Sequence, residues 1–172
     1  MPDLLLRTFQ SLTRIEQLQH DGVLVGSWDH VLAGTEDAYR RMVEVMTDYG
    51  IDTNGRPPIW AWRGPLRLAD ADSLFDAEHE LSSGYVTVTF RAPQHLVLLS
   101  DYGHWCDALM PPADGPIQPW QPRRRDNDSR HPDNDSRHPE QACVPHLHLE
   151  WVDSIRPLPT TGWGTLDLDT LL

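Results

Sequence analysis

The stretch YVTVTFR, residues 85–91, carries the clearest strand pattern in the chain. Its apolar residues Val86, Val88 and Phe90 alternate with residues of a more polar kind. Because successive side chains of a strand point to opposite faces, this alternation predicts a strand with one face in the core. Strands of this kind are typical of antiparallel sheets. The stretch therefore sets the expectation of a mainly antiparallel sheet.

Further strands are expected on both sides of this one, at residues 4–9, 59–63, 96–99 and 147–152. A short helix is expected near residue 13, where Thr13 and Glu16 fit a capping box. The main helix follows Thr35, and its buried stripe recurs at helical spacing. The members of the stripe are Ala38, Met42, Val45, Met46 and Tyr49. The sequence thus predicts one α+β domain over residues 1–172, with two main helices.

The segment 111–145 has a different composition, rich in Pro, Asp, Asn and Arg. It contains DNDSRHP at residues 126–132 and again, letter for letter, at residues 133–139. The repeat has no apolar residue and so cannot build a core. We expect segment 123–141 to be a mobile insertion loop on the surface, because the cost of closing a loop grows only slowly with its length.

Composition excludes several classes of protein. The formal net charge is −12, and all 14 basic residues are arginine. A negative surface repels phosphate backbones, so general binding of duplex nucleic acid is not expected. No apolar run approaches the length that spans a bilayer, so no membrane association is expected. Two cysteines make no disulfide framework, which favours a cytoplasmic location. The charge would steer the chain toward a basic protein partner, as in an acidic antitoxin or immunity protein.

Motifs with strong specificity are absent: the chain has no Walker A sequence, GxGxxG, GxSxG or HExxH. One weaker pattern is His146-x-His148-x-Glu150, whose side chains would share one face of a strand. Such a set suits zinc or another first-row metal, with His104 and Cys106 as further ligands. The alternative is a strand with a polar outer face.

A second pattern follows the apolar run at residues 96–99. Asp101 and His104 can pair as carboxylate and imidazole for general acid–base chemistry. The alternative is structural, with Asp101 capping a short helix that follows it.

A third pattern is the arginine set Arg7, Arg63 and Arg91, each on an expected strand. Guanidinium groups bind phosphate or carboxylate in a bidentate manner. The alternative is three ion pairs with neighbouring acids. Trp60 can stack on a ligand ring, or it can belong to the core with Trp62.

Several segments together resemble DUF3841, a family of small bacterial proteins of unknown function. They are Leu6-Arg7-Thr8-Phe9-Gln10, Ala38–Val43, Pro58–Trp62 and Val97–Tyr102 with His104 nearby. The resemblance covers roughly residues 4–110. In that family the first segment reads more like W-T-I-Q, so Arg7 departs from it. The family implies no activity.

The order of the expected elements is also similar to that of ADP-ribosyltransferase-like domains, whose antiparallel sheet is split. This resemblance implies NAD as cofactor, with Arg7 orienting it, Tyr85 or Trp60 on a middle strand, and Glu150 as the catalytic carboxylate. The Ser-x-Ser signature is absent, so the similarity is one of fold alone.

The leading functional hypothesis is a pocket for a small anionic or nucleotide ligand, in an enzyme of ADP-ribosyltransferase-like type. The candidate catalytic residues are Glu150, Asp101 and His104. The candidate ligand-binding residues are Arg7, Trp60, Arg63, Tyr85 and Arg91. The alternatives are a metal-dependent enzyme and a non-catalytic acidic interaction protein.

Overall fold

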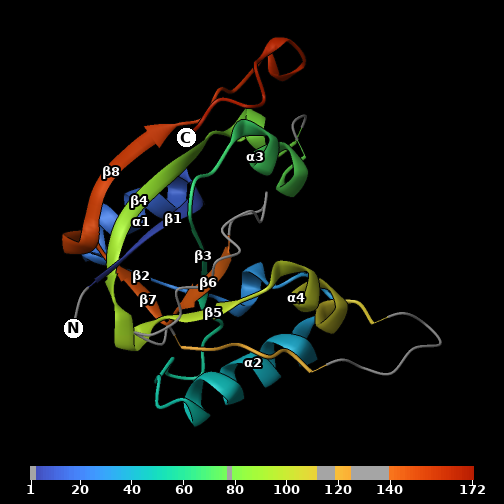
Figure 1. Cartoon of the computed structure of the whole chain (residues 1–172). Coiled ribbons are helices and arrows are strands. Elements are labelled where there is room, and N and C mark those ends of the chain that lie inside the picture. The colour runs from blue at the N-terminus through green and yellow to red at the C-terminus, as the bar shows by residue number, and fades with distance from the viewer. Residues whose placement is uncertain (1–2, 77–78, 112–118, 125–139) are drawn as a thin grey trace.

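The computed structural model describes residues 3–76, 79–111, 119–124 and 140–172, and its strands form two antiparallel sheets (Figure 1). The larger sheet has the strand order β5-β6-β3-β1-β4-β8, and the smaller sheet pairs β2 with β7. The strands are β1 (Asp3–Ser11), β2 (Val23–Val25), β3 (Ile59–Arg63), β4 (Tyr85–Pro93), β5 (Leu98–Ser100), β6 (Glu140–Val144), β7 (His146–His148) and β8 (Val152–Pro157). The helices are α1 (Leu12–Asp21), α2 (Glu36–Asp48), α3 (Leu68–Leu74) and α4 (Tyr102–Leu109). The α+β class with a mainly antiparallel sheet is confirmed.

The apolar face of strand β4 is buried as its alternation predicts, and Thr87 of the opposite face is buried as well, at 1% exposed. Val86, Val88 and Phe90 are buried on one face of the sheet, where they join Ile15 and Leu18 of α1 in a single apolar cluster. The β2/β7 pair contributes to the same cluster, so α1 and the small sheet cover this face together. In Figure 1, α1 lies behind β1 and β4.

Helix α1 begins earlier than the sequence predicts. Strand β1 runs to Ser11, which has extended backbone and is the N-cap of the helix. The Ser11 Oγ accepts a hydrogen bond from the backbone N–H of Arg14, 3.4 Å away. The expected capping box of Thr13 and Glu16 is therefore wrong, because Thr13 already lies in the first helical turn.

The opposite face of the sheet is covered at one end by α2 and α4. Met42 and Met46 of α2 and Trp105 of α4 pack on Trp60 and Cys143 of the sheet. Figure 1 shows these two helices together beside β5. The helical stripe predicted for residues 38–49 is confirmed at its centre, whereas Tyr49 at its end is exposed.

The other end of that face is covered by α3 and the C-terminal tail. The tail holds the start of α3 through backbone hydrogen bonds, from Leu68 N to Thr170 O at 3.1 Å and from Leu172 N to Leu66 O at 2.9 Å. Trp163 is buried in the same cluster. Helix α3 is not among the elements predicted from the sequence.

The last predicted strand, residues 147–152, is two strands separated by a 3₁₀ turn. Strand β7 ends at His148, the turn η4 spans Leu149–Trp151, and β8 begins at Val152. The interruption has a topological reason, since β7 pairs with β2 in the small sheet and β8 pairs with β4 in the large one. A single continuous strand is therefore a wrong expectation.

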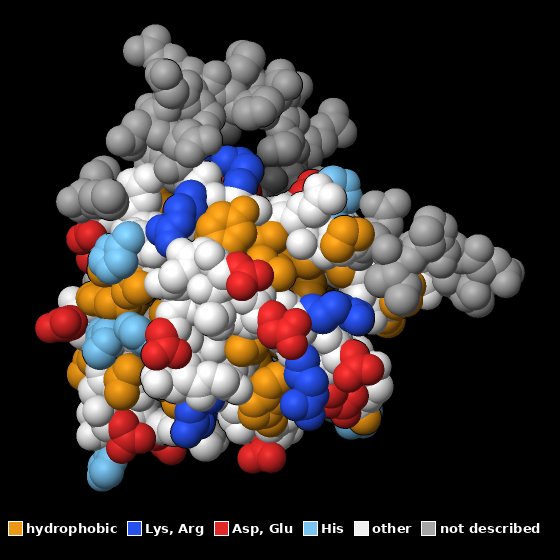
Figure 2. All heavy atoms as spheres, turned by 90° about the horizontal axis from the view of Figure 1, so that it is seen from below, with side chains coloured by type: hydrophobic (Ala, Val, Ile, Leu, Met, Phe, Trp, Pro, Cys, Tyr) orange, Lys and Arg blue, Asp and Glu red, His pale blue; other side chains and the backbone are white. Residues whose placement is uncertain are grey.

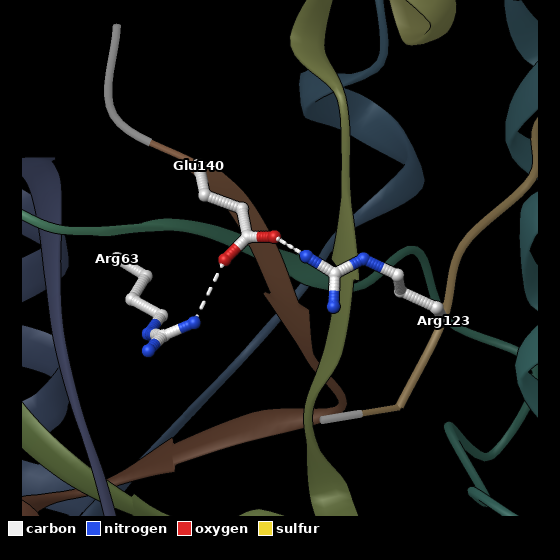
Figure 3. Close-up of polar contacts among 3 residues, drawn as sticks. All are labelled: Arg63, Arg123 and Glu140. Atoms are coloured by element: carbon white, nitrogen blue, oxygen red, sulfur yellow. Dashed lines mark hydrogen bonds and ion pairs between the residues drawn. The ribbon is translucent and has the colours of Figure 1, made fainter. Parts of the chain in front are cut away.

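The ends of the segment 123–141 belong to the sheet. Arg123 forms a backbone bridge with Leu99, with N–O distances of 2.8 and 2.9 Å, and Glu140 and Gln141 begin β6. Glu140 accepts hydrogen bonds from Arg123 and from Arg63 (Figure 3). The two copies of DNDSRHP and the rest of residues 125–139 lie outside the described residues.

Candidate functional site

A groove of about 680 Å³ lies where β1 and β3 separate. Strands β1 and β3 pair with each other at Arg7 and Trp62. Beyond this pair, the later part of β1 and the earlier part of β3 no longer pair with each other, and their residues line the groove. We call this cavity the split groove. Gly26 shapes one of its ends, because a Cβ there would lie 1.8 Å from the Pro57 carbonyl oxygen.

Aromatic side chains line the split groove from the α2 and α4 side. The rings of Trp60 and Trp105 have centroids 4.9 Å apart, and Tyr39 meets Trp105 edge-on at 5.3 Å. The Trp60 Nε1–H donates to the Tyr39 hydroxyl at 3.2 Å. Burial raises the pKa of Tyr39, so its hydroxyl stays protonated at neutral pH. Trp60 is partly exposed and offers apolar ring surface to a planar ligand, whereas Trp105 is 3% exposed and supports it.

A second aromatic group lines the groove from β1, β4 and the end of α3. Phe75 contacts Phe9 at a centroid distance of 5.5 Å and Tyr85 at 4.5 Å. Burial raises the pKa of Tyr85, and the nearby charge of Glu80 raises it further. Tyr85 therefore acts as a neutral hydrogen-bonding group.

Polar groups also line the groove. The Thr8 hydroxyl donates to the Trp60 carbonyl oxygen at 2.6 Å, and the Gln10 Nε2 donates to the Thr8 hydroxyl at 3.0 Å. Gln141 is 2% exposed, and its Oε1 accepts from the Ser100 hydroxyl at 3.2 Å. The groove thus combines aromatic walls with fixed polar groups, which is the usual make-up of small-molecule sites.

Besides the tyrosines, the titratable residues that line the groove within the described part of the chain are Arg14, His30 and Glu80. Arg14 donates to Gln17 Oε1 at 2.7 Å and to the Val25 carbonyl oxygen. Among the described residues it has no carboxylate partner. Burial lowers the pKa of its guanidinium, since partial loss of water disfavours the cation. Helix α1 also begins here and has no acidic residue in its first turn, so its positive end is uncompensated.

The three strand arginines do not gather in one cleft. Arg63 pairs with Glu140 at 3.1 Å, and Arg91 pairs with Asp153 at 3.0 Å. Arg7 donates to the Gly64 carbonyl oxygen at 2.8 Å and does not line the split groove. The alternative of ion pairs holds for Arg63 and Arg91. Of the predicted ligand-binding residues, Trp60 and Tyr85 line the groove.

Asp101 and His104 do not pair through their side chains as carboxylate and imidazole; Asp101 instead caps the following helix, which is the structural alternative. Asp101 is the N-cap of α4, and its Oδ1 accepts from the His104 backbone N–H at 3.0 Å. Both side chains are exposed. Tyr102 between them lines the groove and packs on Trp62 at a centroid distance of 5.1 Å. Burial raises the pKa of Tyr102 to about 12, with smaller effects from Cys106 and Tyr39.

Glu150 does not share a strand face with the two histidines, because it lies in the turn η4, where it is exposed. The rings of His146 and His148 are adjacent, with centroids 4.7 Å apart, and both pack on Trp151. Cys106 and His104 lie on α4. Within the part of the chain that the structure describes, no three His, Cys, Asp or Glu side chains group closely enough to hold a metal ion.

Two residues that line the groove, Arg14 and Gln141, are not among the candidates predicted from the sequence. Arg14 lies on a helix, whereas the predicted arginine set is confined to strands. Gln141 falls at the end of the predicted insertion loop, although the apolar run Ala142-Cys143-Val144 directly after it is a strand signal. Neither residue belongs to a recognisable motif, and each is a candidate only because the folded chain places it on the wall of the groove.

In comparisons with known proteins, no protein-family model, no curated protein and no solved structure matches the chain. The similarities to DUF3841 and to ADP-ribosyltransferase-like domains therefore stay predictions. None of the helices in the described ranges is long and apolar enough to cross a bilayer.

Proposed function

We propose that the split groove binds a small planar ligand that carries an anionic group, a class that includes nucleotides. The observation that carries this proposal is Arg14, a partly buried guanidinium that lines the groove without a carboxylate partner among the described residues. An unpaired charge that has lost part of its water is unfavourable, and a bound anion relieves that cost.

The geometry around Arg14 fits this ligand class. A guanidinium has five N–H donors, and Gln17 and Val25 occupy two of them, which leaves donors for a phosphate or carboxylate. The N-terminus of α1 adds positive potential beside it. The partly exposed ring of Trp60, which packs on Trp105, supplies the stacking surface for a base or a similar ring.

The proposal is one of binding and not of transfer chemistry. Arg7 and Glu150, two of the three positions that the ADP-ribosyltransferase-like resemblance implies, are not among the residues that line the groove. The acidic side chain that does line it is Glu80. NAD⁺ is accordingly one probe among several, tested for binding first and for cleavage second.

An interaction surface for a basic protein has less support. Figure 2 shows acidic side chains scattered over one face of the molecule, interspersed with arginine and small apolar patches. A steering surface gathers charge of one sign in one place.

The test is titration of the whole chain with AMP, ATP and NAD⁺, followed by quenching of tryptophan fluorescence and by calorimetry. We expect saturable binding of at least one probe. Arg14→Gln should weaken that binding about 10- to 100-fold, because it removes a charge-assisted hydrogen bond.

Arg41→Gln is the matched control, since Arg41 is an exposed residue of α2 that does not line the groove. It should leave the affinity unchanged. Absence of saturable binding by every probe, or equal losses in the two variants, would contradict the proposal.

A further inference from the structure

Gln141 is a buried residue whose side-chain oxygen, Oε1, accepts a hydrogen bond from the neighbouring strand β5. Its residue surface is 2% exposed, and its Oε1 accepts from the Ser100 hydroxyl at 3.2 Å. Among the described residues, this is the one hydrogen bond that the amide group makes, and Gln141 lines the split groove. The Nε2 is not one of the fully buried side-chain atoms that lack a partner, so it keeps contact with solvent and can donate to a ligand in the groove.

Strand register explains why this amide is fixed in place. Gln141 of β6 lies opposite Trp62 of β3 on one side and opposite Ser100 of β5 on the other. Ser100 is 4% exposed and Trp62 is 8% exposed, so both neighbours are themselves immobilised by packing. Tyr102 packs against Trp62 and lines the groove with it. The Gln141 side chain is therefore held between two packed neighbours, with its amide lining the groove.

We propose that Gln141 determines the specificity of the split groove by donating a hydrogen bond from Nε2 to a carbonyl-type oxygen on the planar ring of the ligand. The ligand class is then a carboxamide- or oxo-substituted heteroaromatic ring, with its anionic group directed to Arg14. This inference rests on the proposed binding of a planar ligand in the groove.

The physical basis is an asymmetry of hydrogen bonding. A ring without an acceptor leaves the amide unpaired and removes its access to water, whereas a ring with an acceptor satisfies it. Sites built around a buried hydrogen-bonding group reject analogues that lack the matching group more strongly than apolar pockets reject a change of size. A neutral amide also favours a neutral acceptor, which leaves the anion to Arg14.

The test uses two neutral probes: nicotinamide, whose carboxamide carries a carbonyl acceptor and an NH2 donor, and 3-methylpyridine, which has neither group. Titration of ¹⁵N-labelled protein should shift the side-chain amide signals of Gln141 with nicotinamide. Nicotinamide should bind about 5- to 10-fold more tightly than 3-methylpyridine, as expected for one net hydrogen bond. Gln141→Leu should abolish the preference.

Two further variants test whether the preference depends on the N–H group of Gln141. Gln141→Glu keeps the volume and the acceptor for Ser100 but has no N–H, so it too should lose the preference, even if the leucine variant fails to fold. Gln19→Leu is the matched control, since Gln19 is exposed on α1 and does not line the groove. It should retain the preference.

The outcomes separate this inference from the proposed function. Unshifted Gln141 signals, or an undiminished preference in both Gln141 variants, would overturn the role of Gln141, even where nucleotide binding still depends on Arg14. Loss of the nicotinamide preference in the Gln141 variants, with no nucleotide bound by the wild-type chain, would support the role of Gln141 and overturn the proposed anion site.

Discussion

At the scale of single residues, Glu140 joins three parts of the chain. Its carboxylate accepts from Arg63 of β3 and from Arg123, which precedes residues 125–139 (Figure 3). The side chain of Glu140 is 24% exposed, less than either arginine. Partial shielding from water strengthens such a network relative to an open surface pair.

Glu140→Gln should lower the free energy of unfolding by about 1 kcal/mol, because two guanidinium groups lose their counter-charge. Urea denaturation at low ionic strength measures this change, and added salt should reduce it. Asp153→Asn is the control, since the Arg91–Asp153 pair is more exposed and should contribute less. A loss no larger than that of the control would contradict the expectation.

Protonation of the His146 ring should make the free energy of unfolding depend on pH. Burial lowers its pKa below the ordinary 6.5, and the neighbouring His148 lowers it further. The unfolded chain therefore binds the proton more readily than the folded one. The contribution of His146 to stability is complete above about pH 6.5 and is lost as the pH falls through its folded pKa.

NMR titration of the His146 ring should give a pKa below 6.5, and His148→Gln should move that pKa upward by removing one of the two causes. His146→Gln should reduce the loss of unfolding free energy between about pH 7 and 5. A pKa at or above 6.5 in the wild-type chain would contradict the assignment of burial as the main cause.

At the scale of elements, the junction of β1 and α1 positions the groove. Strand β1 ends at Ser11 and the helix begins at the next residue, so one short stretch supplies the end of a strand, a helix cap and Arg14. The cap depends on a single hydroxyl that accepts from the Arg14 backbone N–H.

Ser11→Ala should lower the free energy of unfolding by about 1 kcal/mol, the typical cost of losing an N-cap side chain. Thr13→Ala at the cap position expected from sequence should have a much smaller effect, because Thr13 makes no capping bond. Thermal and urea unfolding of both variants would measure this. Equal losses would show that the helix is capped in a different way.

Elements with strong local patterns could be predicted, and elements held by distant contacts could not. The alternation of β4 and the apolar stripe of α2 are written in neighbouring residues. Helix α3 is short and is fixed by hydrogen bonds to residues about a hundred positions later, such as Thr170. No local window of sequence contains that information.

At the scale of the whole molecule, the candidate site depends on where two strands stop pairing. Trp60 and Tyr85 could be selected from sequence because aromatic residues on strands stand out. Their partners could not, since Arg14, Gln141 and Trp60 line one groove only because β1 and β3 diverge after one registered pair. Tertiary geometry, and not any motif, brings the groove together.

The ends of the segment that holds the duplicated heptad have a consequence for how this chain can change. Arg123 and Glu140 are tied to each other, and Arg123 is bridged to Leu99, so the chain leaves the sheet and rejoins it at neighbouring points. Losing or gaining one copy of the seven-residue repeat changes the length of chain between these two fixed points, and the closure entropy varies only slowly with that length. We therefore expect the closure entropy to place little constraint on the number of copies.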